Sequence, residues 1–182
     1  MKTLIVYFSF SGNNEMVALK LKEMLHCDLL RITELKKRGG FSIFLDIFLN
    51  RTPRIEDHRM KINEYDHVIL VAPIWASKIA TPLKSFLLLE KNRIRFYSFI
   101  TVCSGSPNQK TKIEDELTRL AGKAPVLVTE LSINDLARSM QKNTIKNLIA
   151  YHLKTSDLSF FVNEIEGHLK MTEEFVLSHE TV

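Results

Sequence analysis

The amino-acid sequence predicts an α/β fold, in which a five-stranded parallel sheet lies between two layers of helices as a three-layer α/β/α sandwich. Short apolar runs rich in β-branched and aromatic residues alternate along the chain with longer stretches whose apolar residues recur at helical spacing. The 182 residues contain no internal repeat and no Gly/Ser-rich or Pro-rich linker. Such alternation favours parallel strands joined by right-handed helical crossovers. We therefore expect a single domain over residues 1–182.

Five apolar runs are predicted to be the strands. The first, at residues 3–8, is β-branched and aromatic, which is typical of a strand that is buried on both faces. The third, with the sequence YDHVILVA at residues 65–72, gives the clearest signal. The remaining strands are predicted at residues 28–32, 96–102 and 126–131.

Helices are predicted between and after these strands. Residues 14–26 carry apolar side chains at helical spacing. Thr81 and Pro82 are predicted to be the N-cap and the first residue of a helix that continues to Leu89. Further helices are predicted at residues 112–120, 143–153 and 158–169.

Composition narrows the class of function. The net charge of +4 is equal to the surplus of Lys and Arg between Arg31 and Lys61, so the basic character is local, which is not the pattern of a general nucleic-acid binder. The two cysteines and six histidines lack the spacing of metal ligands, so no metal site is predicted. No signal peptide and no membrane-spanning run is recognisable. We therefore expect a soluble, cytoplasmic protein.

The predicted topology places the candidate site. In an open parallel sheet, ligands bind outside the carboxyl ends of the strands, at the crevice where the strand order reverses. Three loops follow such strand ends, at residues 9–14, 73–77 and 103–108, and all three are rich in small and hydroxylic residues. The second loop also carries Trp75, the only tryptophan of the chain.

The first loop has the features of a phosphate site. It leads into a helix N-terminus, where free amides and the helix dipole favour an anion, and Gly12 permits close approach of the backbone. The motifs GxxxxGK[ST] and GxGxxG are both absent, which argues against hydrolysis of a nucleotide triphosphate and against the usual dinucleotide site. A loop of hydroxyls and amides without lysine suits a single phosphate monoester. The alternative is an ordinary turn with a Ser or Asn cap.

The other two loops are less specific. Trp75, at the end of a buried strand, could stack on a planar ligand, and the alternative is that it packs over a neighbouring helix end. The third loop, Ser-Gly-Ser-Pro at its centre, also suits an ordinary surface turn.

Together the three loops and their flanking elements resemble the flavodoxin-like family. YFSFSGNNEMVALKL is similar to the phosphate loop and following helix of that family, and YDHVILVAPIWASKIATPLKSFL is similar to its third strand, first ring-binding loop and next helix. FITVCSGSP is similar to the fourth strand and second ring-binding loop. The order and spacing match over residues 1–131. The resemblance implies the strand order 2-1-3-4-5 and flavin mononucleotide (FMN) as the cofactor.

The resemblance also implies which residues contact FMN, and it gives no catalytic residue. The phosphate would be held by the first loop, which consists of Ser9, Phe10, Ser11, Gly12, Asn13 and Asn14. One side of the flavin ring would be lined by Pro73, Ile74, Trp75, Ala76 and Ser77. The pyrimidine side would be approached, chiefly through backbone groups, by Cys103, Ser104, Gly105 and Ser106.

Three features depart from the family pattern. Asn14 stands where the family usually has threonine, and its amide could still cap the helix. The third loop lacks the tyrosine that covers the outer ring face in many electron-carrying flavodoxins. Those carriers are usually strongly acidic, whereas the pI of this sequence is about 9.0. The last two departures argue against a carrier role, and none of the three argues against cofactor binding.

The basic segment at residues 36–59 contains an apolar run at residues 41–49. We expect a core helix that covers the sheet. The alternative is a partly exposed apolar cover beside the flavin that serves a quinone, a homodimer partner or a membrane surface. The clustered arginines could attract the phosphates of a nicotinamide cofactor.

These observations favour an FMN-dependent oxidoreductase that takes hydride from NAD(P)H and reduces a quinone-like or other small acceptor. One alternative is a flavodoxin-type carrier of single electrons between redox protein partners. Another is an adaptor of the same fold that binds no flavin. His67, on the third strand, is expected to be structural, and Cys103 is expected to be a buried, inert thiol.

Overall fold

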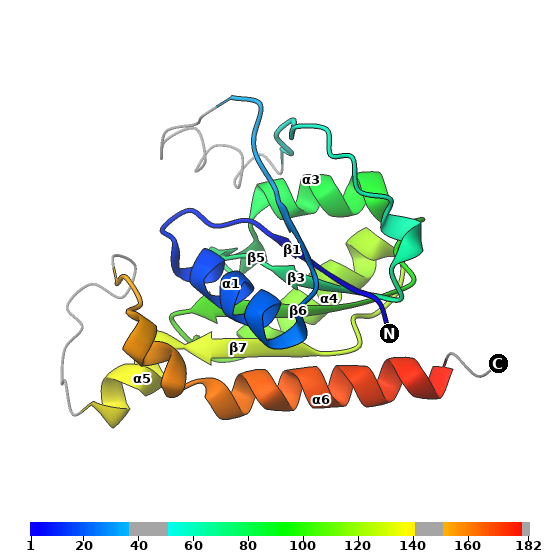
Figure 1. Cartoon of the computed structure of the whole chain (residues 1–182). Helices are drawn as coiled ribbons and strands as arrows, with labels where there is room; N and C mark the ends of the chain where they lie inside the picture. Colours follow the sequence, from blue (N-terminus) through cyan, green and yellow to red (C-terminus); the bar gives the residue numbers. More distant parts are fainter. Residues whose placement is uncertain (37–50, 141–150, 180–182) are drawn as a thin grey trace.

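The computed structural model describes residues 1–36, 51–140 and 151–179, and its centre is a parallel five-stranded sheet (Figure 1). The strands are β1 (Thr3–Tyr7), β2 (Asp28–Arg31), β3 (His67–Val71), β6 (Phe96–Cys103) and β7 (Val128–Ser132). Their order is β2-β1-β3-β6-β7, and every neighbouring pair is parallel. The predicted fold class and the strand order 2-1-3-4-5 are therefore confirmed.

Burial on both faces explains why the central strands have no polar alternation. In β1, Leu4 and Val6 belong to the apolar core on one face of the sheet, whereas Ile5 and Tyr7 belong to the core on the other face. Helices α3 (Thr81–Glu90) and α4 (Gln109–Ala121) cover the first face. Helices α1 (Asn13–Leu25), α5 (Ile133–Ser139) and α6 (Val162–His179) cover the second (Figure 1). Two short 3₁₀ helices, Ile62–Glu64 and Thr155–Ser159, contribute Ile62 to the first core and Leu158 to the second.

The start of α3 differs from the prediction by one residue. Ala80 is the N-cap, Thr81 is the first helical residue and Pro82 lies in the first turn. The reason is that Ala80 is hydrogen-bonded both to the segment before it and to the helix after it. Its N–H donates to the Pro73 carbonyl at 3.0 Å, and its carbonyl accepts from the N–H of Leu83 at 3.0 Å. The helix therefore begins directly where the preceding hairpin closes.

The prediction for the last helix was wrong in its bounds. The helix predicted at residues 158–169 begins at Val162 and continues to His179. The first buried residue after the predicted end is the polar Thr172, which is only 1% exposed, so counting apolar residues missed the second half. Helix α5 and the two-stranded sheet β4 (Ile74–Trp75) and β5 (Lys78–Ile79) were not predicted.

Two predictions fall largely on residues outside the described ranges. The apolar run at residues 41–49 lies there entirely, so its role as core helix or cover is not addressed. Of the helix predicted at residues 143–153, only residues 151–153 are described, and they are not helical. From the same basic segment, Ile55 is described and is buried in the core beside α3.

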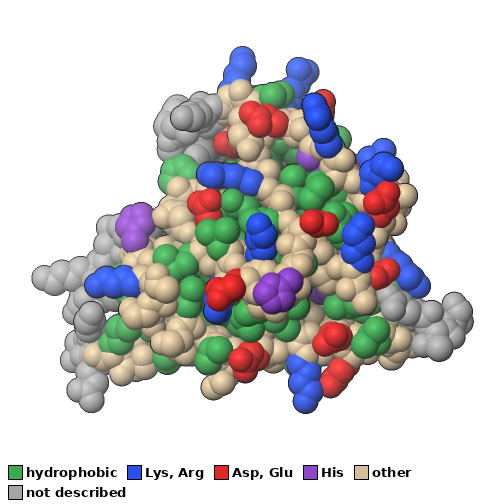
Figure 2. Space-filling model, viewed as in Figure 1, with side chains coloured by type: hydrophobic (Ala, Val, Ile, Leu, Met, Phe, Trp, Pro, Cys, Tyr) green, Lys and Arg blue, Asp and Glu red, His purple; other side chains and the backbone are tan. Residues whose placement is uncertain are grey.

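Charged side chains of both signs are interspersed over most of the face that Figure 2 shows. Among the described residues, none of the helices combines the length and the hydrophobicity that crossing a bilayer requires.

Candidate functional site

A cavity of about 420 Å³ opens at the carboxyl ends of β1, β3 and β6. This is the edge of the sheet where ligands of doubly wound folds bind, next to the point where the strand order reverses. The cavity is lined by Phe10, Ser11, Asn13, Asn14, Pro73, Ile74, Trp75, Val102, Cys103, Ser104, Ile133 and His152.

The structure brings all three predicted loops to this cavity, although not every predicted residue lines it. The predicted residues on its wall are Phe10, Ser11, Asn13, Asn14, Pro73, Ile74, Trp75, Cys103 and Ser104. The predicted residues that do not line it are Ser9, Gly12, Ala76, Ser77, Gly105 and Ser106. The sequence did not point to Val102, Ile133 or His152.

The loop before α1 and the start of the helix contribute Ser11, Asn13 and Asn14 to the cavity wall. Gly12 is the N-cap, with the left-handed angle φ of 91° and no side-chain cap. A Cβ at this position would meet no atom within 4 Å, so glycine is needed for its conformation and not for space. The Gly12 N–H donates to the Ser9 hydroxyl at 3.1 Å, which closes the loop. The amides of the first helical turn have no acceptor within the helix and remain available to an anion.

The side chains of Asn13 and Asn14 are engaged with other parts of the chain. The Asn14 Oδ1 accepts from the N–H of Val102 at 3.0 Å and so joins α1 to the end of β6. This amide does not cap the helix, in contrast to the expectation from the sequence. The Asn13 Nδ2 donates to the Tyr151 carbonyl at 2.7 Å, and its Oδ1 accepts from the Leu153 N–H at 2.9 Å. The Asn13 side chain and the Asn14 Oδ1 are therefore engaged within the protein, whereas the backbone amides of both residues have no acceptor within the helix.

A β-hairpin made of β4 and β5 places Trp75 at the cavity. Its two-residue turn, Ala76 and Ser77, has φ of 48° and 59°, the left-handed geometry of a tight hairpin. The buried Glu116 carboxylate of α4 anchors the hairpin by accepting from the N–H of Ile79 at 2.8 Å. The turn residues thus support the loop, and Trp75 forms the wall.

The indole of Trp75 packs against two phenylalanines of the first strand and loop. Its ring centroid lies 5.8 Å from that of Phe8 and 6.1 Å from that of Phe10, both in edge-on geometry. Phe10 is 63% exposed, and Trp75 is half-buried. The indole therefore contacts aromatic rings at and just beyond the end of β1. It also packs against the core on the face of the sheet that α3 and α4 cover.

The third loop supplies a neutral wall. Cys103 is buried, and burial together with the Glu130 carboxylate raises the pKa of its thiol to about 11, so the thiol stays protonated at neutral pH. Gly105 has φ of 80°, and a Cβ there would lie 2.3 Å from the Ser132 hydroxyl oxygen. Gly105 is thus required by close packing against the end of β7, and the thiol of Cys103 is buried, as the sequence predicted.

Within the described part of the chain, His152 is the only residue on the cavity wall whose side chain can become cationic. The wall carries no carboxylate, and no group of three His, Cys, Asp or Glu side chains in the described ranges is placed to hold a metal. The site therefore suits binding and orientation of a ligand through amides, hydroxyls and apolar surfaces.

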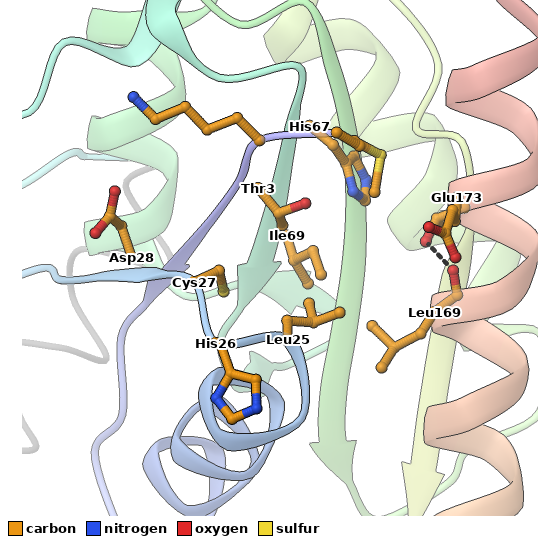
Figure 3. A pocket seen from close by; sticks show the side chains of 12 residues that line it. Thr3, Leu25, His26, Cys27, Asp28, His67, Ile69, Leu169 and Glu173 are labelled. Carbon is orange, nitrogen blue, oxygen red and sulfur yellow. Dashed lines mark hydrogen bonds between the residues drawn. The ribbon is translucent and has the colours of Figure 1, made fainter.

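A second cavity, of about 400 Å³, lies at the opposite edge of the sheet, where the strands begin. Figure 3 shows Thr3, Cys27 and His67 around it, between the end of α1 and α6. His67 is completely buried, and among the described residues neither of its ring nitrogens has a hydrogen-bond partner. Burial lowers the pKa of His67 to about 4, so this ring is neutral.

Comparison with known proteins finds similar solved structures but no similar family profile or curated sequence. No profile of a protein family matches the chain, and no curated protein sequence does. A flavoprotein from Lactobacillus acidophilus NCFM, solved in complex with FMN, has a TM-score of 0.63 and 21% identity over 76% of this chain and 97% of that one. A candidate flavoprotein from Bacteroides eggerthii has a TM-score of 0.62 and 18% identity over 83% and 99% of the two chains.

The Trp repressor binding protein from Bacillus subtilis has a TM-score of 0.51 and 13% identity over 84% of this chain and 99% of that one. At these identities the likeness concerns the fold. The strand order, the loop before α1 and the shared architecture together confirm that this chain has the flavodoxin-like fold.

Proposed function

We propose that this chain is an FMN-binding redox protein with its cofactor in the cavity at the carboxyl ends of β1, β3 and β6. The observation that carries the proposal is the convergence of two unlike features on one cavity. A lysine-free loop with free helix amides suits a phosphate monoester, and a half-buried tryptophan on the same wall suits a planar ring. The similar flavoprotein from Lactobacillus acidophilus, which was solved with FMN, supports this assignment.

The residues present fit the parts of FMN. The amides at the start of α1 would hold the phosphate, and Ser11 adds a hydroxyl on the same wall. Apolar surfaces of Ile74, Val102 and Ile133 would exclude water from the ring. When bound, the flavin supplies transfer of hydride and of single electrons.

The protein groups at this site would act by placement and not by proton transfer. The Cys103 thiol is protonated at neutral pH, and the described wall offers no carboxylate as a base. Selectivity would therefore follow from how the hairpin and the loop before α1 orient the ring, and from what can approach its open edge.

Within this proposal, we favour an oxidoreductase that takes hydride from NAD(P)H and reduces a quinone-like or other small acceptor. The pI of about 9.0 supports an enzyme, because a surplus of basic groups attracts the phosphates of a nicotinamide cofactor. An electron carrier with this polarity would need an acidic protein partner.

The test uses the purified protein and free FMN. Saturable FMN binding, followed by rapid bleaching of the flavin absorbance when NADH or NADPH is added without oxygen, is the expected result. Bleaching by dithionite but not by either nicotinamide would contradict the enzyme and support the carrier. Absence of FMN uptake would contradict the whole proposal.

A further inference from the structure

A segment distant in sequence forms part of the wall beside the loop before α1. Residues 151–154 lie against this loop because Asn13 holds them with both ends of its amide, at 2.7 Å to the Tyr151 carbonyl and 2.9 Å to the Leu153 N–H. Leu153 is 5% exposed and packs into the core beside α1. The segment is therefore joined both to the loop and to the interior.

The same segment is also fixed from its other side. Asp157, only 2% exposed, accepts hydrogen bonds from the Tyr151 hydroxyl and from the Lys154 N–H, both at 2.8 Å. Tyr151 and Leu153 are thus restrained directly. His152 lies between them, so its backbone is held by the hydrogen bonds of its two neighbours.

His152 is directed to the loop that we assign to the phosphate. Its Nδ1 lies 3.0 Å from the Ser11 carbonyl oxygen, and the side chain lines the same cavity as Ser11 and Asn14. A carbonyl oxygen only accepts, so Nδ1 carries a proton in this contact. Among the described residues no hydrogen bond involves Nε2, which leaves the second nitrogen available to a ligand.

The chemistry of the wall indicates which part of a ligand His152 would meet. The rest of the described wall is neutral, so the helix amides alone would otherwise balance a phosphate dianion. An imidazolium donates from both nitrogens, and hydrogen bonds between a cation and a phosphate are stronger than neutral ones. A flavin without a phosphate would gain nothing from this group.

We infer that His152 belongs to the phosphate subsite and gives this chain selectivity for the phosphorylated flavin over riboflavin. This inference rests on the proposed FMN site. His152 acts on the phosphate and not on the ring, so its contribution is absent when riboflavin is bound.

The test measures the dissociation constants of FMN and riboflavin for the full chain and for His152→Ala and His152→Gln. Both variants should weaken FMN binding by about 10- to 100-fold, the usual size of a lost charge-assisted hydrogen bond. Riboflavin binding should change by less than about twofold, because the ring contacts are intact. Thermal unfolding of each variant reports whether the segment still folds.

Arg138→Ala is the matched control. Arg138 is an exposed cation on α5, at the same end of the sheet, and it does not line the cavity. Its removal should leave the ratio of the two affinities unchanged. A His152→Ala variant that retains the wild-type ratio, or that loses both flavins equally, would overturn the inference while FMN binding by the wild type stands. A wild-type chain that binds no FMN would overturn the proposed function as well.

Discussion

The two cavities at opposite edges of the sheet are nearly equal in volume, about 420 and 400 Å³, yet they are built from different groups. The cavity at the carboxyl ends is made of loops that offer amides, hydroxyls and aromatic rings. The cavity at the amino ends is made of strand starts and helix ends that bring titratable side chains together, among them Cys27, Asp28, His67 and Glu173 (Figure 3).

The two ends of the sheet differ in how their polar groups are used. At the carboxyl edge, the side chain of Asn13 bonds to the backbone of residues 151–153 and that of Asn14 bonds to the backbone of Val102. The amides at the start of α1 have no acceptor within the helix. At the amino edge, His67 is buried without a partner among the described residues, which costs free energy of folding. Nearby, the ring of His168 hydrogen-bonds to the hydroxyls of Thr129 and Ser98. Burial is the main cause that lowers the pKa of His168 to about 3, and the neighbouring His67 lowers it further. We therefore expect changes at the two edges to have different consequences.

The largest effect is expected at the carboxyl edge. Ser11→Asp should weaken FMN binding by about 100-fold or more, because a carboxylate beside the phosphate adds repulsion of several kcal/mol at short range. Isothermal titration with FMN measures this loss. Thr111→Asp, which adds the same charge at an exposed position on α4, should change the affinity by less than about threefold. Equal affinities for the two variants would show that the phosphate does not bind at the start of α1.

The second effect is a dependence of stability on pH that arises at the amino edge. The pKa of His67 is lowered from 6.5 to about 4, so the unfolded chain binds a proton that the folded chain rejects. Its contribution to stability is complete above about pH 6.5 and is lost as the pH falls toward 4, by up to about 3 kcal/mol. His67→Leu should reduce this slope in urea unfolding between pH 7.5 and 5.

The control for this prediction is His179→Ala, which removes an exposed histidine from the end of α6. Its stability should follow the same pH dependence as the wild type. A slope that is identical for the wild type and His67→Leu would mean that burial of this ring does not produce the acid sensitivity.

A third effect distinguishes the ring from the phosphate within the carboxyl-edge cavity. Trp75→Ala should weaken FMN and riboflavin by a similar factor of about ten, because the proposed site places the planar ring of both ligands beside the indole. Trp75→Phe should retain most of the affinity. Phe175→Ala, a partly exposed aromatic on α6, serves as the control. A loss confined to FMN would contradict the placement of the ring beside Trp75.

The smallest effect concerns the hairpin turn. Ala76 has φ of 48°, a conformation that costs an L-residue roughly 1 kcal/mol and that glycine adopts freely. Ala76→Gly should therefore raise the free energy of unfolding by up to about 1 kcal/mol in urea titrations. Ala121→Gly, in the last position of α4, should lower it by a comparable amount. A destabilised Ala76→Gly variant would indicate that the turn is not strained.

The parts of the fold that the sequence predicted are those with a local signal. The runs around β1 and β3 are apolar on both faces, so each could be recognised as a buried strand. Helix α6 was predicted too short because the first buried residue after the predicted end is the polar Thr172. The hairpin of β4 and β5 was missed because each strand has two residues and the turn lacks the usual Asn-Gly pair.

The candidate site was predictable to the extent that it consists of loops directly after strands. Ser11 and Trp75 follow from strand ends and from the resemblance to a known family, and both line the cavity. His152 could not be predicted, because its contact with Ser11 joins residues 141 positions apart and no local sequence pattern indicates it. Asn14 was assigned to the right loop, but its link to Val102 depends on the sheet register.

The most direct test of the central claim is an FMN titration followed by the fluorescence of Trp75, the only tryptophan in the chain. The account predicts saturable quenching with one equivalent of FMN, because the flavin ring would lie against the indole. It also predicts that Ser11→Asp loses this quenching at the same concentrations. Absence of quenching in the wild type, or equal quenching in Ser11→Asp, would contradict an FMN site at the carboxyl edge of the sheet.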